Sequence, residues 1–211
     1  MNIKTVIVSL TITNIFGVSY LIFKNKVSNF DYTKIILIIF TSIFGVVLGG
    51  YSLGVIDSFF IKKVFGLMII FTGLYDFGVQ KGYLNKFRLK SNFLTTSLVG
   101  LIGGFFSGLI GAAGTIYALY FNQTLEDKKE FKLYISIVFL VLLLVRAIYY
   151  VADPNTRIYY DPLFIVISIP AVFIGVYIGN LLTEKVSNKI FKEIVSISII
   201  LMGVYITVSN Y

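Results

Sequence analysis

Long apolar runs, separated by short polar stretches, set the pattern of hydrophobic and polar positions along the chain. Each run has about the length of a bilayer span, which takes roughly 20 predominantly apolar residues in an α-helix. The runs are too continuously apolar for barrel strands, which alternate over about ten residues. Because only helices and closed barrels satisfy their backbone in lipid, the pattern predicts an all-α, polytopic integral membrane protein. The predicted full spans lie at about 5–23, 34–56, 62–80, 131–152, 162–183 and 189–209.

A further apolar segment, at about 93–123, differs from these spans because it is rich in glycine. Its length, about 30 residues, is long for one crossing and short for two at 1.5 Å per residue. If it dips into the bilayer and returns, nearly all loop lysines fall on the cytosolic side, as the positive-inside rule expects. A single crossing would divide the basic residues almost evenly between the two sides. We therefore predict a re-entrant or broken helix that enters from the cytosolic side and leaves on the same side.

Glycine spacing within this segment predicts two roles. Gly100, Gly104 and Gly108 recur every four residues, a spacing that lets a helix pack closely on a neighbour. Gly108, Gly111 and Gly114 recur every three residues around the expected reversal, where glycine permits the backbone angles of a tight bend. The uncovered N–H groups of such a bend can face an anion. A glycine-rich packing helix with no ligand is the alternative.

An internal repeat emerges when the chain is compared with itself at a shift of 130 residues, because residues 31–75 then match 161–205 without a gap. Three crossings and one re-entrant segment in each copy would make the two copies inverted. Inverted repeats are common in transporters, whose substrate sites lie near the midplane at broken helices. The matched pairs include Asp31 with Asp161, Gly45 with Gly175, Gly49 with Gly179, Lys62 with Lys192 and Gly73 with Gly203.

We expect one integral membrane domain built from two repeats, an incomplete first repeat at 1–90 and a second repeat at 91–211. In the second copy, residues 91–130 precede the helix at 131–152, and the first copy has no counterpart of them. The chain therefore resembles a transporter without the opening segment of its first repeat. A truncated reading frame, a misplaced start and a true short variant are the alternatives. Within the second copy, Asp161 followed by Pro162 predicts a helix start.

Composition supports the membrane interpretation and removes several kinds of chemistry. The 211 residues are 57% hydrophobic and only 13% charged, with a mean hydropathy of +0.90, whereas soluble domains are nearer 45–50% apolar. The net charge of +8 comes with lysines in short loops beside the spans, so it indicates membrane topology and no nucleic-acid partner. Cysteine and histidine are absent, which excludes disulfides, thiolate and imidazole metal sites and histidine acid–base catalysis. We expect no metal, no cofactor and no enzyme activity.

Arg146 is the main candidate for contact with a substrate, because it lies about two-thirds of the way along its predicted span. A charge deep in the bilayer costs about 2.5–3.5 kcal/mol on insertion scales. A planar guanidinium suits an oxyanion, so we expect Arg146 to bind a small anion. The alternatives are snorkelling to the outer interface and pairing with Asp153 or Asp161.

Polar residues of the first span and of the glycine-rich segment complete the candidate site. Ser9, Thr11, Thr13 and Asn14 either line a polar path or make hydrogen bonds between helices, and both interpretations stay open. Tyr150 is expected in the aromatic belt at the membrane interface. The predicted substrate-binding residues are Asn14, Ser107, Gly108, Gly111, Ala112, Ala113, Gly114, Thr115 and Arg146.

Several stretches of the chain resemble the sulfite exporter (TauE/SafE-like) permease family. Four stretches resemble the second half of the family's sequence, namely GFFSGLIGAAGT, LVRAIYY, IPAVFIGVYIGNLL and FKEIVSISIILMGVY. Residues 31–80 resemble the later part of its first half. Family members typically carry a turn of the pattern G-x-x-S-G-x-x-G-x-G-G-P, from which this chain departs at Ala113, where glycine is usual, and at Thr115, where proline is usual. The matching positions are Gly104, Ser107, Gly108, Gly111 and Gly114.

The resemblance implies an eight-helix integral protein of the bacterial inner membrane that moves sulfite, sulfonates or related small sulfur-containing or organic anions. We therefore expect a multi-pass permease in the cell membrane. Its expected partners are the lipid bilayer and a small anionic substrate, and a homo-oligomer is left open. A truncated or structural membrane protein with no transport activity of its own is the alternative.

Overall fold

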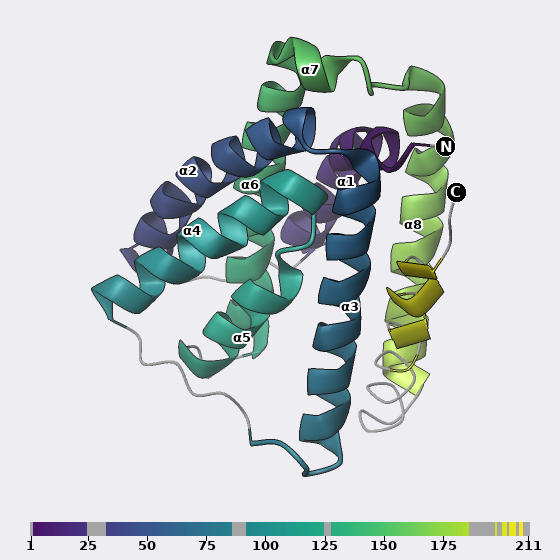
Figure 1. Cartoon of the computed structure of the whole chain (residues 1–211). Helices are drawn as coiled ribbons and strands as arrows, with labels where there is room; N and C mark the ends of the chain where they lie inside the picture. Colours follow the sequence, from purple (N-terminus) through teal and green to yellow (C-terminus); the bar gives the residue numbers. More distant parts are fainter. Residues whose placement is uncertain are drawn as a thin grey trace. The chain divides into compact units, whose positions relative to one another are not determined.

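The part of the chain that the structure describes is all-helical (Figure 1). The computed structural model describes residues 2–24, 33–85, 92–124 and 128–185, together with positions 197, 200, 201, 203–205, 207 and 208. Its helices are α1 (Ile3–Lys24), α2 (Thr33–Val55), α3 (Ser58–Gln80), α4 (Phe93–Ile110), α5 (Gly114–Thr124), α6 (Lys128–Ala152), α7 (Pro154–Arg157) and α8 (Pro162–Lys185).

Most of these helices have the length and apolar composition of membrane spans. Within the described residues, α1, α2, α3, α4 and α6 are long and apolar enough to cross a bilayer, and α8 contains a shorter apolar stretch at Pro162–Gly175. An all-α, multi-pass membrane protein is therefore confirmed. Each of the first five predicted spans coincides with a helix to within a few residues. Most of the sixth predicted span, 189–209, lies outside the described residues.

The start of α8 is the one that the sequence predicts. The Asp161 carboxylate accepts a hydrogen bond of 3.0 Å from the backbone N–H of Phe164, and Pro162 is the first helical residue. Proline is tolerated there because the first N–H groups of a helix have no intrahelical acceptor. The local sequence therefore fixes this boundary.

The chain forms two compact units. One unit comprises Met1–Ile56 and Arg88–Val172, and the other comprises Asp57–Phe87 and Phe173–Tyr211. In the second unit, α3 packs on described residues near the end of the chain, because a Cβ built on Gly66 would lie 3.1 Å from the carbonyl oxygen of Gly203. The division into repeats at residue 90 is a statement about sequence similarity, and it stays a prediction.

In the first unit, α2 and α4 pack backbone against backbone (Figure 1). A Cβ built on Gly45 of α2 would lie 2.6 Å from the backbone nitrogen of Phe105. A Cβ built on Gly104 of α4 would lie 2.8 Å from the Cα of Ser42. The packing role predicted from the four-residue spacing is therefore confirmed, and the partner is α2. The contacts advance together along both helices, which makes the pair parallel: Gly100 lies against Ile38, Gly104 against Ser42, and Gly108 against Val46.

The glycine-rich segment is a broken helix whose second arm turns back along the first (Figure 1). Tyr117 lies beside Gly103, where a Cβ would be 2.7 Å from the Cζ of the tyrosine. One turn further along α5, the hydroxyl of Tyr120 lies 2.7 Å from that of Thr96. Later residues of α5 thus meet earlier residues of α4, so the arms are antiparallel and α5 returns toward the level at which α4 begins. A broken helix that reverses is therefore confirmed.

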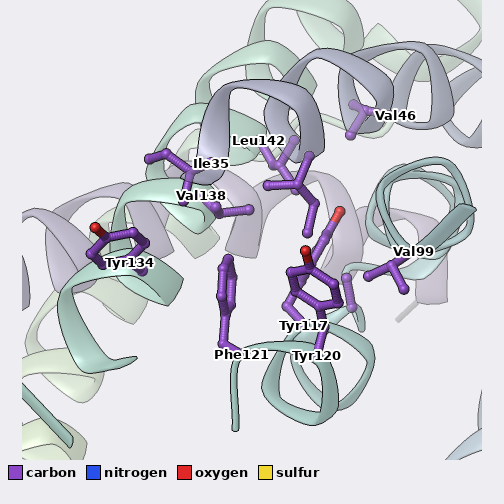
Figure 2. Packing of buried hydrophobic residues seen from close by; sticks show 11 residues of the cluster. Ile35, Val46, Val99, Tyr117, Tyr120, Phe121, Tyr134, Val138 and Leu142 are labelled. Carbon is purple, nitrogen blue, oxygen red and sulfur yellow. The ribbon is translucent and has the colours of Figure 1, made fainter. Parts of the chain in front are cut away.

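The core of this unit is built around the inner face of α5 (Figure 2). In lipid, helices associate through close packing and interhelical hydrogen bonds instead of the hydrophobic effect. Both are present, since Tyr117 is fully buried and its hydroxyl lies 2.8 Å from that of Ser42 in α2. Figure 2 shows Tyr117, Tyr120 and Phe121 extending from α5 toward residues of the neighbouring helices, namely Ile35, Val46, Val99, Tyr134, Val138 and Leu142.

Candidate functional site at the break between α4 and α5

The break is made by a glycine that ends α4. Gly111 has φ 74° and ψ 10°, in the left-handed region that side chains with a Cβ rarely adopt. Its N–H donates a hydrogen bond of 2.9 Å to the carbonyl oxygen of Ser107. This is the usual way to close a helix at its C-terminus, so the glycine at this position has a structural reason.

The second arm starts immediately after the break. The first intrahelical hydrogen bond of α5 runs from the N–H of Tyr117 to the carbonyl of Ala113, at 3.2 Å. The N–H groups of Gly114, Thr115 and Ile116 precede it, and helix geometry gives them no acceptor within α5. The N-terminus of a helix carries partial positive charge and favours anions. The break therefore places the C-terminus of α4 and the N-terminus of α5 within three residues of each other.

Arg146 of α6 lies at the end of α4. Its side chain is only 3% exposed, and its Nη1 donates a hydrogen bond of 2.5 Å to the carbonyl oxygen of Ser107. A Cβ built on Gly111 would lie 3.0 Å from the same nitrogen. The structure therefore brings Arg146 to the predicted turn. A cation at the C-terminus of a helix is also stabilised by the helix dipole.

The guanidinium keeps unused hydrogen-bonding capacity. Nε of Arg146 is buried and has no hydrogen-bond partner among the described residues. Leaving a buried donor unsatisfied costs about 1–3 kcal/mol, and more for a charged group. Nη1 is occupied by Ser107, whereas a guanidinium presents several donors in a fixed plane that match the oxygens of an oxyanion. An oxyanion is a ligand that would satisfy Nε.

Tyr150 belongs to this cluster, and its predicted place at the membrane interface is wrong. The side chain is 1% exposed, and its hydroxyl donates a hydrogen bond to the carbonyl oxygen of Gly108. The Cζ of Arg146 lies 6.0 Å from the centre of its ring. The i, i+4 spacing from Arg146 is a signal that could have indicated a shared helix face.

The remaining predicted site residues differ in their placement. Ala113 is buried in the core, and Ala112 and Gly114 are half-buried beside it in the break. The side chain of Thr115 lies outside the described part of the structure. Asn14 is exposed on α1, and the described contacts connect no atom of it to the break. The residues that contacts bring together are Ser107, Gly108, Gly111, Arg146 and Tyr150.

The buried hydroxyls of α1 are used in hydrogen bonds. Thr11 donates to the carbonyl of Ile7 at 2.7 Å, and Thr13 donates to the carbonyl of Ser9 at 3.3 Å. The hydroxyl oxygen of Ser9 accepts a bond of 3.3 Å from the N–H of Asp161. The two threonine bonds run within α1, and among the described bonds of these hydroxyls only that of Ser9 links α1 to another segment, so both interpretations stay open.

A family model described as sulfite exporter TauE/SafE matches residues 1–206. No curated protein and no solved structure matches the chain.

Proposed function

Since the chain belongs to the sulfite exporter TauE/SafE family, we propose that it moves sulfite, a sulfonate or a related small organic anion across the bacterial inner membrane. The family consists of membrane transporters, and the chain is a multi-pass membrane protein. In the proposed mechanism the anion binds at the break between α4 and α5, with Arg146 as its cationic partner. The family and the chemistry of the guanidinium support this substrate class.

The observation that carries the proposal is that Nε of Arg146, beside the turn at Gly111, is buried and has no hydrogen-bond partner within the part of the chain that the structure describes. Intramembrane cations are costly and are usually paired. Among the described residues, the hydrogen bond of Arg146 goes to a neutral carbonyl instead of a carboxylate. A bound anion would supply the missing countercharge, and the N–H groups at the start of α5 would add neutral donors. This combination resembles the broken-helix sites at which transporters bind anionic groups.

Replacing Gly111 by leucine should reduce anion flux at least about tenfold. A non-glycine residue at this φ costs about 1–2 kcal/mol, and the new Cβ would lie 3.0 Å from Nη1, so the guanidinium must move. The measurement is uptake of radiolabelled sulfite or ethanesulfonate into proteoliposomes. Gly82→Leu is the matched control, because Gly82 has φ 78° but a Cβ there meets nothing within 4 Å in the described part of the chain.

Equal flux in Gly111→Leu and Gly82→Leu would show that the break is not part of the binding site. If the unmodified chain gave no flux above protein-free liposomes with either anion, the proposed function itself would fail. That outcome would favour a membrane protein without transport activity of its own.

Both ends of the α4–α5 hairpin should be accessible from the cytosolic side. The chain contains no cysteine, so single cysteines report accessibility without background. We expect Asn92→Cys, before α4, and Glu130→Cys, in the first turn of α6, to react with an impermeant thiol reagent from one face of the membrane. Asn155→Cys in α7 should react from the other face. Opposite accessibility of positions 92 and 130 would refute the re-entrant arrangement.

A further inference from the structure

Two side chains of α6 hold the last turn of α4. Arg146 and Tyr150 are four residues apart, so they share one face of the helix. Nη1 of Arg146 binds the carbonyl of Ser107, and the hydroxyl of Tyr150 binds the carbonyl of Gly108. Ser107 and Gly108 are consecutive residues in the last turn of α4, where few backbone N–H groups remain to donate to the carbonyls. The tyrosine hydroxyl thus donates to the carbonyl of Gly108, which would otherwise compete with an anion for the N–H groups of the guanidinium.

Tyr150 also contacts the guanidinium itself. The 6.0 Å between the Cζ of Arg146 and the ring centre is at the outer limit of a cation–π contact. The ring lies against one side of a group whose Nη1 is fixed by Ser107. Together these contacts restrict the guanidinium to an orientation in which Nε has no partner among the residues that the structure describes.

Tyr150 is itself anchored from the connection that follows α6. The hydroxyl of Thr156, which is fully buried, donates a hydrogen bond of 3.0 Å to the backbone carbonyl of Tyr150. Thr156 lies in α7, whose first turn is capped by the Asp153 side chain. The end of α6 is therefore held in place, and so is the side chain that Tyr150 presents to α4.

We infer that Tyr150 is a positioning residue for anion binding, an inference that rests on the proposed function. Its hydroxyl occupies the Gly108 carbonyl, and this leaves Nε of Arg146 available to the anion. Without the hydroxyl, Gly108 offers a buried acceptor to the unsatisfied donor of Arg146. The guanidinium then turns toward the helix end, and the anion loses a hydrogen bond.

Tyr150→Phe tests this inference in the full chain reconstituted in liposomes. The KM for ethanesulfonate should rise about 3- to 10-fold, the factor that corresponds to one lost hydrogen bond, while Vmax stays within about twofold. Tyr149→Phe is the matched control: it is adjacent on α6, its ring packs on Gly50, and no hydrogen bond of its hydroxyl is among those described. Its KM should not change.

A double-mutant cycle separates positioning from a general structural role. In an Arg146→Lys background, adding Tyr150→Phe should change KM by less than about twofold, because the hydroxyl acts through the guanidinium. The same 3- to 10-fold rise in both backgrounds would overturn the inference, as would equal KM values for Tyr150→Phe and Tyr149→Phe. Should Tyr150→Phe not be recovered folded, Thr156→Val serves instead: a KM rise of at least about twofold is expected, and an unchanged KM overturns the inference. Failure of the unmodified chain to transport would instead contradict the proposed function.

Discussion

Arg146→Ala should reduce anion flux in proteoliposomes to the level of protein-free liposomes. The substitution removes the cation that contacts both Ser107 and the turn at Gly111. Removing one partner of a buried charge pair costs about 2–5 kcal/mol, which is roughly 30-fold or more in affinity. Flux of sulfite and ethanesulfonate, measured across a range of concentrations, checks this expectation.

Two further substitutions make the result specific. Arg146→Lys keeps the charge but loses the planar set of donors, so flux should fall less than in Arg146→Ala and remain above background. Arg157→Ala removes an exposed arginine of α7 and should leave flux unchanged. Normal flux in Arg146→Ala, with equal amounts of protein in the liposomes, would exclude Arg146 from the site.

Gly45→Ala should destabilise the protein more than any other methyl addition that we propose. The new Cβ would lie 2.6 Å from the backbone nitrogen of Phe105, and a backbone atom cannot move aside as the end of a side chain can. The helices α2 and α4 must then separate, at a cost of about 1–3 kcal/mol for such overpacking. The measurement is thermal unfolding in detergent, monitored by size-exclusion chromatography as the loss of the folded monomer or oligomer peak.

The matched control comes from the internal repeat. Gly175 is the residue paired with Gly45 in the sequence, and it lies in α8, where a Cβ meets no atom of the described residues within 4 Å. Gly175→Ala should be neutral or stabilising by up to about 1 kcal/mol, since alanine favours the helix. Equal midpoints for the two alanine variants would show that close contact between α2 and α4 does not contribute to stability.

The positions of the helices could be predicted from the sequence, because the thickness of the bilayer sets the length of the apolar run that a helix needs to span it. The break near Gly111 was also predictable, since glycine spacing changes there from four residues to three. The identity of the helix that packs on Gly100, Gly104 and Gly108 was not predictable. Spacing describes one surface, whereas the pairing with α2 depends on which surfaces meet in three dimensions.

The sequence predicted Arg146 and the turn at Gly111 as parts of the candidate site, but it did not predict Tyr150. Arg146 stood out because charge in an apolar run is costly. Tyr150 did not stand out, because tyrosine near a span end is ordinary at a membrane interface. Asn14 was predicted from its polarity alone, and polarity does not indicate which face of α1 a neighbour covers.

The contact between α2 and α4 has a mechanical consequence for the hairpin. At Gly45, Gly49, Gly104 and Gly108 the two backbones are in direct contact, so we expect α4 to slide or tilt only if α2 moves with it. The arm α5 is attached differently, through the hydroxyl pairs Ser42–Tyr117 and Thr96–Tyr120 and through side-chain packing. Such hydroxyl pairs can exchange for other partners at a cost of about 1 kcal/mol each. If the hairpin rearranges during a transport cycle, we expect α4 to move only together with α2, whereas α5 can move only by breaking these hydroxyl pairs and unpacking Tyr117, Tyr120 and Phe121 from the core.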